Sequence, residues 1–269
     1  MRLTFGYAAA EASDEAEKNM NALLARVSAG AGHEIVASPQ DAYGDVAQGV
    51  HKGELDLAWV SPIPFIALVR NESVIPLASP QRGGTHYHGA LVVGADTPIG
   101  ELSALVGRRA AWVDRYSAAG FVVPRIELAK VGIDKTKLGP QKFYGSHMAA
   151  MQAVASGDAD FGATFVRLAP NGAIVGGPWI GKPDLERRLR IFATFGEIPP
   201  DVVVARHNLD LAVRERVRES LLSLTDDARG AEMLAAVFGA EGMFVPNLDR
   251  YEPLREEALA AVKEQMLEV

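Results

Sequence analysis

The feature that most constrains the fold is an alternation of short apolar runs with segments of helical periodicity. Residues 55–60 form a near-continuous apolar run, which is typical of a strand buried on both faces of a parallel sheet. Residues 12–27 carry apolar side chains at helical spacing, and strand-like runs flank them at residues 3–7 and 33–37. This order predicts an α/β fold whose ligands bind at the carboxyl ends of the strands.

The alternation is interrupted twice by turn-forming residues, at residues 81–85 and 196–200. Between these breaks we expect strands at residues 87–93, 109–113, 141–144, 159–163 and 190–194, with helices near 100–106, from 117, and at 147–156. After the second break we expect a strand at residues 202–205 and mostly helix from 209 to 269. The pattern predicts two lobes, each a mixed sheet flanked by helices, with a ligand cleft between them. Lobe one comprises residues 1–84 and 197–269, and lobe two comprises residues 85–196.

Composition excludes several classes of function. The net charge is −7 and the pI is about 5.4, which argues against nucleic-acid binding because that needs a basic face. The chain has no cysteine, so disulfides and thiolate catalysis are excluded. No apolar run approaches the roughly 20 residues that span a bilayer, so we expect no direct membrane insertion. We expect a periplasmic or extracytoplasmic location if a leader has been removed, and a cytoplasmic one if Met1 is the native start.

The segment of residues 114–125 is the best candidate for a binding site. It follows an apolar strand and places Ser117, Ala118, Ala119 and Gly120 where a helix should begin. The start of a helix presents unpaired N–H groups and a partial positive charge, and small side chains let an anion approach them. Ser117 is equally suited to cap an ordinary helix, so both interpretations stand on local sequence alone.

Other polar residues give weaker signals. Ser61 ends a strand, where ligand sites gather in such sheets, but it can also simply cap a helix before Pro62. His86 and His88 lie on one strand face without an evident third ligand, so we expect no metal site. We find no catalytic or nucleotide-binding motif, and we expect neither a cofactor nor an enzyme.

Four segments together resemble the phosphate/phosphonate-binding proteins of ABC transporters, within the type 2 periplasmic binding protein fold. They are residues 53–62, 113–125, 143–160 and 198–204. The resemblance implies an oxyanion held by Ser117 and by the N–H groups of Ala118, Ala119 and Gly120. It also implies a serine–histidine pair at the next helix start, which matches Ser146 and His147. Two tyrosines of the family match Tyr43 and Tyr87, which can also be ordinary packing residues.

The chain departs from the family at one point. Members usually carry hydroxyl side chains at the positions of Ala118 and Ala119, and each lost charge-assisted hydrogen bond would be worth about 1.5–3 kcal/mol. The backbone donors remain. A carboxylate or a larger anion therefore becomes a more plausible ligand than the family alone would suggest.

The resemblance implies a solute-binding protein that closes its lobes on a small phosphate- or phosphonate-like anion and then contacts the membrane permease of an ABC transporter. Two alternatives remain open from the sequence. One is an enzyme on the same fold, such as a lyase resembling chorismate dehydratase. The other is a ligand sensor whose closed form contacts a regulatory partner.

Overall fold

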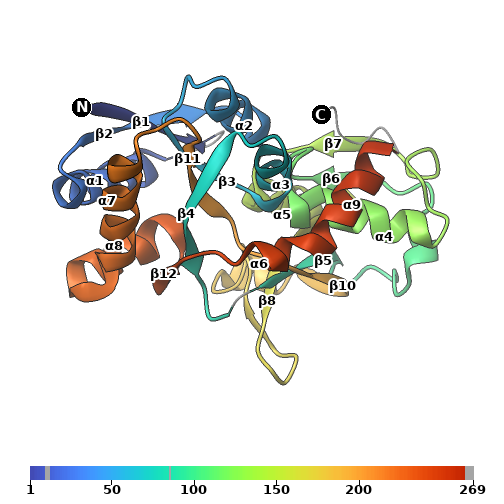
Figure 1. Cartoon of the computed structure of the whole chain (residues 1–269). Coiled ribbons are helices and arrows are strands. Elements are labelled where there is room, and N and C mark those ends of the chain that lie inside the picture. The colour runs from blue at the N-terminus through green and yellow to red at the C-terminus, as the bar shows by residue number, and fades with distance from the viewer. Residues whose placement is uncertain (10–12, 85, 264–269) are drawn as a thin grey trace. The chain divides into compact units, whose positions relative to one another are not determined.

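A computed structural model of the chain describes residues 1–9, 13–84 and 86–263 (Figure 1). The contacts divide it into two compact units, Met1–Thr85 with Pro200–Tyr251, and His86–Pro199 with Glu252–Val269. The chain thus passes between units near residues 85 and 199, close to the two predicted breaks. It passes a third time after Tyr251, so that α9 (Glu252–Lys263) is grouped with the second unit, whereas we had placed residues 197–269 together in lobe one.

The first unit is built on a six-stranded sheet of order β12-β4-β11-β3-β1-β2. Strands β1, β2 and β3 are parallel, and β11 runs antiparallel to both β3 and β4. The strands are β1 (Arg2–Ala8), β2 (Glu34–Gln40), β3 (Leu57–Val60), β4 (Val74–Gln81), β11 (Val202–Arg206) and β12 (Gly242–Phe244). The helices are α1 (Asp14–Ala31), α2 (Tyr43–His51), α3 (Pro62–Arg70), α7 (Leu211–Leu222) and α8 (Ala228–Phe238), with 3₁₀ turns at Ser223–Asp226 and Leu248–Tyr251.

Helices cover both faces of this sheet, which explains the continuous apolar run in β3. Leu57 and Val203 belong to a buried cluster with apolar residues of α1, α7 and α8. Ala58 and Val204 point the other way and belong to a cluster with residues of α2 and α3. Because β1, β2 and β3 are parallel, the helices that follow them, α1, α2 and α3, all begin at the carboxyl edge of the sheet.

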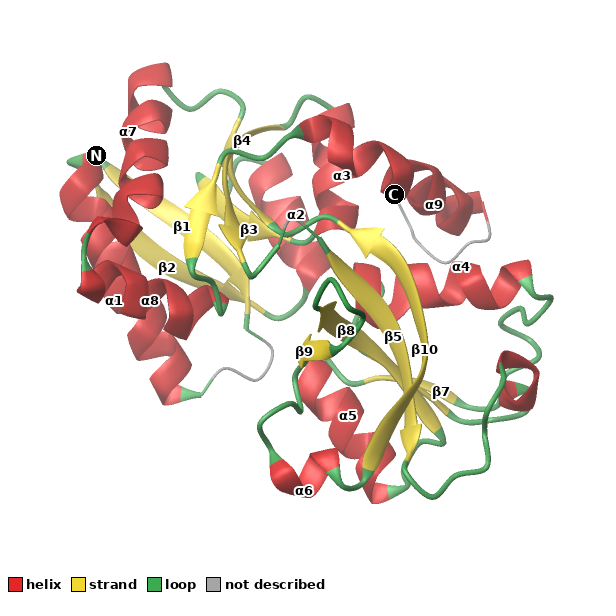
Figure 2. Ribbon diagram, turned by 90° about the horizontal axis from the view of Figure 1, so that it is seen from below, coloured by secondary structure: helices red, strands yellow, loops and turns green. Residues whose placement is uncertain are grey.

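The second unit repeats this plan with a sheet of order β10-β5-β8-β6-β7, to which β9 adds beside β8. Figure 2 shows the long antiparallel pair of β5 and β10. The strands are β5 (Tyr87–Gly94), β6 (Ala110–Trp112), β7 (Gln141–Phe143), β8 (Phe161–Leu168), β9 (Ile174–Gly176) and β10 (Leu189–Ile198). The helical segments are η1 (Leu102–Leu105), η2 (Ala118–Val122), α4 (Val123–Lys130), α5 (His147–Ser156), α6 (Pro183–Glu186) and α9.

Two apolar layers hold the second sheet. Residues of α5 pack with Ala111 of β6 and Val166 of β8 in one buried cluster. Trp112 is fully buried and makes edge-to-face contacts with Phe121 of η2 and Phe161 of β8, at ring-centroid distances of 5.4 and 5.7 Å. Aromatic packing thus fixes η2 against β6.

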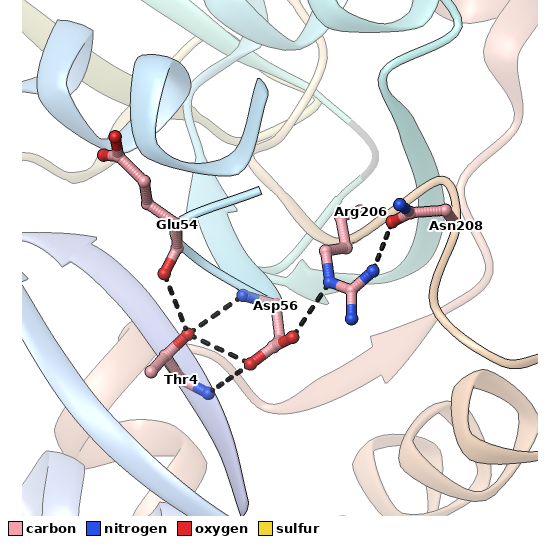
Figure 3. Close-up of polar contacts among 5 residues, drawn as sticks. All are labelled: Thr4, Glu54, Asp56, Arg206 and Asn208. Atoms are coloured by element: carbon pink, nitrogen blue, oxygen red, sulfur yellow. Dashed lines mark hydrogen bonds and ion pairs between the residues drawn. The ribbon is translucent and has the colours of Figure 1, made fainter. Parts of the chain in front are cut away.

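In each sheet an aspartate just before a central strand forms hydrogen bonds to a neighbouring strand or to the residue just before it. In the first unit the Asp56 carboxylate accepts the Thr4 N–H at 2.9 Å and pairs with Nε of Arg206 at 2.9 Å (Figure 3). In the second unit the Asp160 carboxylate accepts the Arg109 N–H at 2.8 Å and pairs with that residue's guanidinium at 2.9 Å. These hydrogen bonds lower the pKa of Asp160. Asp56 and Asp160 are therefore structural residues.

Most expected elements are present, and one expectation needs correction. The helix expected near residues 100–106 is only the 3₁₀ turn η1, which ends at Leu105, two residues before the left-handed Gly107 (φ 75°). The stretch after residue 209 is mostly helical, as expected, and it also contains a short strand that was not expected, β12, which pairs with β4. Strand β9 was not expected. Predictions on residues 10–12, 85 and 264–269 lie outside the described residues. In the described part, no helix is both long and apolar enough to span a membrane.

Candidate functional site

The connection from β6 to η2 forms a tight turn that ends in a capped helix start. The Asp114 carboxylate accepts the N–H of Tyr116 at 2.7 Å, and the N–H of Ser117 donates to the carbonyl of Asp114 at 3.1 Å. Ser117 has an extended backbone and is 2% exposed, and its Oγ accepts the N–H of Gly120 at 3.0 Å. The sequence therefore places a true N-cap at Ser117.

The helix opens with a wide turn. The N–H of Val122 donates to the carbonyl of Ser117 at 3.0 Å, and the N–H of Val123 donates to that of Ala118, so both bonds span five residues. Such turns are frequent at functional sites. The first N–H groups of a helix, here those of Ala118 and Ala119, have no carbonyl partner within it. They remain the backbone donors that the sequence proposed for an oxyanion, while the N–H of Gly120 is bonded to the Ser117 cap.

Gly120 has a steric role at this turn. A Cβ atom there would lie 2.4 Å from Cγ2 of Val113, 2.5 Å from its Cβ and 2.8 Å from Oγ of Ser117. Carbon atoms do not approach this closely, so any side chain would push η2 away from β6. The absence of a side chain at Gly120 is what allows the turn to pack on the strand.

The second candidate helix start is the amino end of α5. Gly145 has a left-handed backbone (φ 77°), and Ser146 caps the helix by accepting the N–H of Ala149 at 3.1 Å. Val113 joins this turn to the first one. Its N–H donates to the carbonyl of Gly120 at 3.1 Å, and its carbonyl accepts the N–H of Gly145 at 2.9 Å. The two helix starts proposed for the anion are therefore hydrogen-bonded to one residue.

His147 is the first residue of α5 and lies in an apolar setting. Its Nδ1 is 3.0 Å from Oγ1 of Thr164, and its ring meets the edge of Phe165 at 5.0 Å. Burial lowers the pKa of His147 from 6.5 to about 4, so the ring is neutral at pH 7. When Thr164 donates to Nδ1, Nε2 carries the proton and can donate to an anion. Tyr87, predicted as a site residue, contacts the same Phe165 ring at 6.2 Å.

In the first unit, the two predicted residues line one pocket. Tyr43 is the first residue of α2, and Ser61 caps α3 from the end of β3, where its side chain makes no capping hydrogen bond. The pocket has a volume of about 90 Å³, and its walls are Ala8, Tyr43, Val46, Trp59, Val60, Ser61 and Asp201. It lies at the carboxyl edge of the sheet, where the fold class predicts binding.

Sequence reasoning missed Trp59 and Asp201, although both lie inside the quoted segments. Asp201 is paired with Arg82, whose Nη1 and Nη2 both donate to its Oδ2 at 3.1 Å. Arg82 also donates from Nε to the carbonyl of Phe238 at 2.6 Å and lies 6.0 Å from the Trp59 ring centroid. The indole Nε1 of Trp59 is buried and has no acceptor among the described residues. Trp59 could have been predicted from Ser61, because residues two apart in a strand point to the same face of the sheet.

The histidine pair near the chain crossing is a separate feature. The rings of His86 and His88 are 5.4 Å apart, and Nε2 of His86 is 3.8 Å from an oxygen of Glu197, whose side chain is mostly exposed. Burial and the neighbouring His86 lower the pKa of His88, which disfavours a charged pair. Among the residues that the structure describes, no three histidine, aspartate or glutamate side chains are grouped to hold a metal ion.

Comparison with known proteins identifies the family. Residues 5–251 match the model of the ABC transporter phosphonate periplasmic substrate-binding proteins. The chain belongs to this family. It is 26% identical over 176 residues to the phosphate-import protein PhnD of Mycolicibacterium smegmatis, a match that covers 61% of this chain and about half (54%) of that protein. The family is one of binding proteins, which favours the expected solute-binding role over the enzyme alternative.

Solved structures show the same fold. A binding protein component of an ABC phosphonate transporter from Pseudomonas aeruginosa superimposes with a TM-score of 0.83 at 20% identity, covering 98% of this chain and 87% of that one. PhnD1 from Prochlorococcus marinus, solved in complex with methylphosphonate, gives a TM-score of 0.82 at 20% identity and covers 99% of both chains. These matches confirm the predicted type 2 periplasmic binding protein fold.

Proposed function

We propose that this chain is the solute-binding component of an ABC transporter and that it captures a small organophosphorus anion. One observation carries the proposal beyond the family. Two capped helix starts, at Ser117 and Ser146, belong to turns that are both hydrogen-bonded to Val113, so the two helix starts are neighbours at one strand end of the second unit. Paired helix starts of this kind supply several N–H donors and two positive dipole ends to an oxyanion.

In this proposal the anion is bound mainly by backbone groups. Ala118 and Ala119 are 1% and 2% exposed, so their N–H groups lie in a poorly hydrated setting where a hydrogen bond to an anion is strong. The hydroxyls of Ser117 and Ser146 and the neutral His147 ring add donors. Because two alanines stand where the family usually has hydroxyls, we propose weaker binding of inorganic phosphate than of an alkylphosphonate, whose carbon substituent needs no donor.

The first unit has a complementary role in this proposal. The pocket between Tyr43, Trp59 and Ser61 accommodates the substituent of the ligand. Capture involves closure of the two lobes on the ligand, and the closed form then contacts a membrane permease. A fall in the radius of gyration on adding ligand, measured by small-angle X-ray scattering, would accompany this closure.

Isothermal titration calorimetry with a panel of anions tests the proposal. The panel consists of phosphate, phosphite, methylphosphonate, ethylphosphonate, 2-aminoethylphosphonate and propionate. We expect at least one organophosphorus anion to bind with a micromolar Kd, and Ser117→Ala with Ser146→Ala to weaken it at least tenfold. If no organophosphorus anion of the panel binds with a Kd below millimolar, or if propionate binds most tightly, the organophosphorus proposal is wrong.

A further inference from the structure

The wall of the first unit's pocket contains a carboxylate whose negative charge is balanced by a neighbouring arginine. Asp201 forms part of its wall, and a carboxylate in a ligand pocket would ordinarily favour a cationic group. Both terminal nitrogens of Arg82, however, donate to Oδ2 of Asp201 at 3.1 Å. The two side chains are 19% and 20% exposed, so the pair is largely shielded from water.

Further contacts hold Arg82 in place. Its Nε donates to the carbonyl of Phe238, at the end of α8, and its guanidinium lies over the ring of Trp59. Three donors of one planar group are thus committed to fixed partners in the same unit, which orders the side chain. Arg82 therefore belongs to the built structure of the pocket wall.

A ligand ammonium entering this pocket would lose its hydration and gain no net attraction. The Arg82–Asp201 pair has a total charge of zero, and the guanidinium would repel the ammonium while the carboxylate attracts it. The wall also contains the ring of Trp59, whose Nε1–H is a donor, and the apolar side chains of Val46 and Val60. The apolar part of this wall suits an uncharged alkyl substituent.

We infer that Arg82 is a specificity-determining residue that makes the protein select phosphonates with uncharged substituents over aminoalkylphosphonates. The inference rests on the proposed function, because it concerns the substituent of the anion bound there. Arg82 acts through Asp201, by occupying the carboxylate that would otherwise bind an amine.

The test compares ethylphosphonate with 2-aminoethylphosphonate, which differ by one amino group at the end of the same carbon chain. In the wild-type protein we expect ethylphosphonate to bind at least tenfold more tightly. In Arg82→Gln, which leaves Asp201 unpaired, we expect this ratio to fall at least tenfold. In the double variant Arg82→Gln/Asp201→Asn the ratio should return toward the wild-type value, because the charge that attracts the amine is gone.

A matched control is available in the same sheet. Arg206 pairs with Asp56 at 2.9 Å (Figure 3), with side chains 21% and 19% exposed. Neither residue is among those that line the pocket. Arg206→Gln removes an equally buried pair and should leave the ligand ratio unchanged. Arg82→Lys keeps a cation beside Asp201 and should retain the preference for ethylphosphonate.

The outcomes separate this inference from the proposed function. Wild-type protein that binds 2-aminoethylphosphonate as tightly as ethylphosphonate overturns the inference, even if Arg82→Gln does not fold. A ratio within threefold of wild type in a folded Arg82→Gln variant also overturns it. If no phosphonate binds the wild type, the proposed function fails, and the inference with it.

Discussion

The contact between η2 and β6 provides the sharpest prediction, through Gly120→Ala. The new Cβ would lie 2.4 Å from Cγ2 of Val113, which is fully buried, and 2.8 Å from the Oγ that caps the helix. Neither neighbour can move freely, because the Val113 N–H donates to the carbonyl of Gly120 itself. Inserting a methyl group into packed surroundings costs about 1–3 kcal/mol. We expect the free energy of unfolding to fall by about that amount.

The same substitution should also impair ligand binding. Displacing η2 redirects the N–H groups of Ala118 and Ala119, which the proposal assigns to the anion. We therefore expect the Kd for the best organophosphorus ligand of the panel to rise at least a hundredfold.

Denaturant unfolding gives the stability change, and calorimetry gives the affinity. Gly100→Ala is the matched control, because a Cβ at Gly100 meets no atom within 4 Å and should change stability by less than about 0.5 kcal/mol. If Gly120→Ala behaves like Gly100→Ala in both measurements, the proposed packing of the anion site is wrong.

Three further predictions concern other parts of the two units. Because the folded pKa of His147 is about 4 and the unfolded value is 6.5, the unfolded chain binds the extra proton between these values, and stability should fall by about 2 kcal/mol from pH 7 to pH 5. In His147→Gln this pH-dependent loss of unfolding free energy should disappear, as measured by denaturant unfolding at pH 7 and pH 5. An equal loss in the variant would contradict the lowered pKa of His147. Asp56→Ala removes the acceptor of the Thr4 N–H and should cost about 1–3 kcal/mol of stability while ligand affinity stays within twofold; a large loss of affinity would refute its structural role. Ala118→Ser adds a hydroxyl at the helix start and should tighten phosphate binding about tenfold in calorimetry, whereas weaker binding would show that the hydroxyl does not reach the anion.

The sequence allowed the prediction of the local features of this fold. The apolar run around Leu57 identified a strand buried on two faces, Ser117 is a helix cap as its position suggested, and the helix expected from His147 begins there. Both signals are local, because the period of the hydrophobic pattern and the chemistry of a cap involve only a few neighbouring residues.

The missed features depend on residues that meet only after folding. Arg82 and Asp201 are 119 positions apart, and nothing in either segment indicates that the charge of Asp201 is neutralised. Strand β12 is three residues long and is stabilised by pairing with β4, which short-range periodicity does not reveal. The grouping of α9 with the second unit likewise depends on contacts that form only after folding, with α4 and η2.

Nuclear magnetic resonance of ¹⁵N-labelled protein tests the central claim most directly, because it reports on single backbone N–H groups. On titration with the tightest organophosphorus ligand, we predict large, saturating downfield shifts of the Ala118 and Ala119 amides, while the Gly120 amide, bonded to Ser117, moves less. Saturable binding that leaves the Ala118 and Ala119 signals unchanged would contradict the claim that these helix-start donors hold the anion.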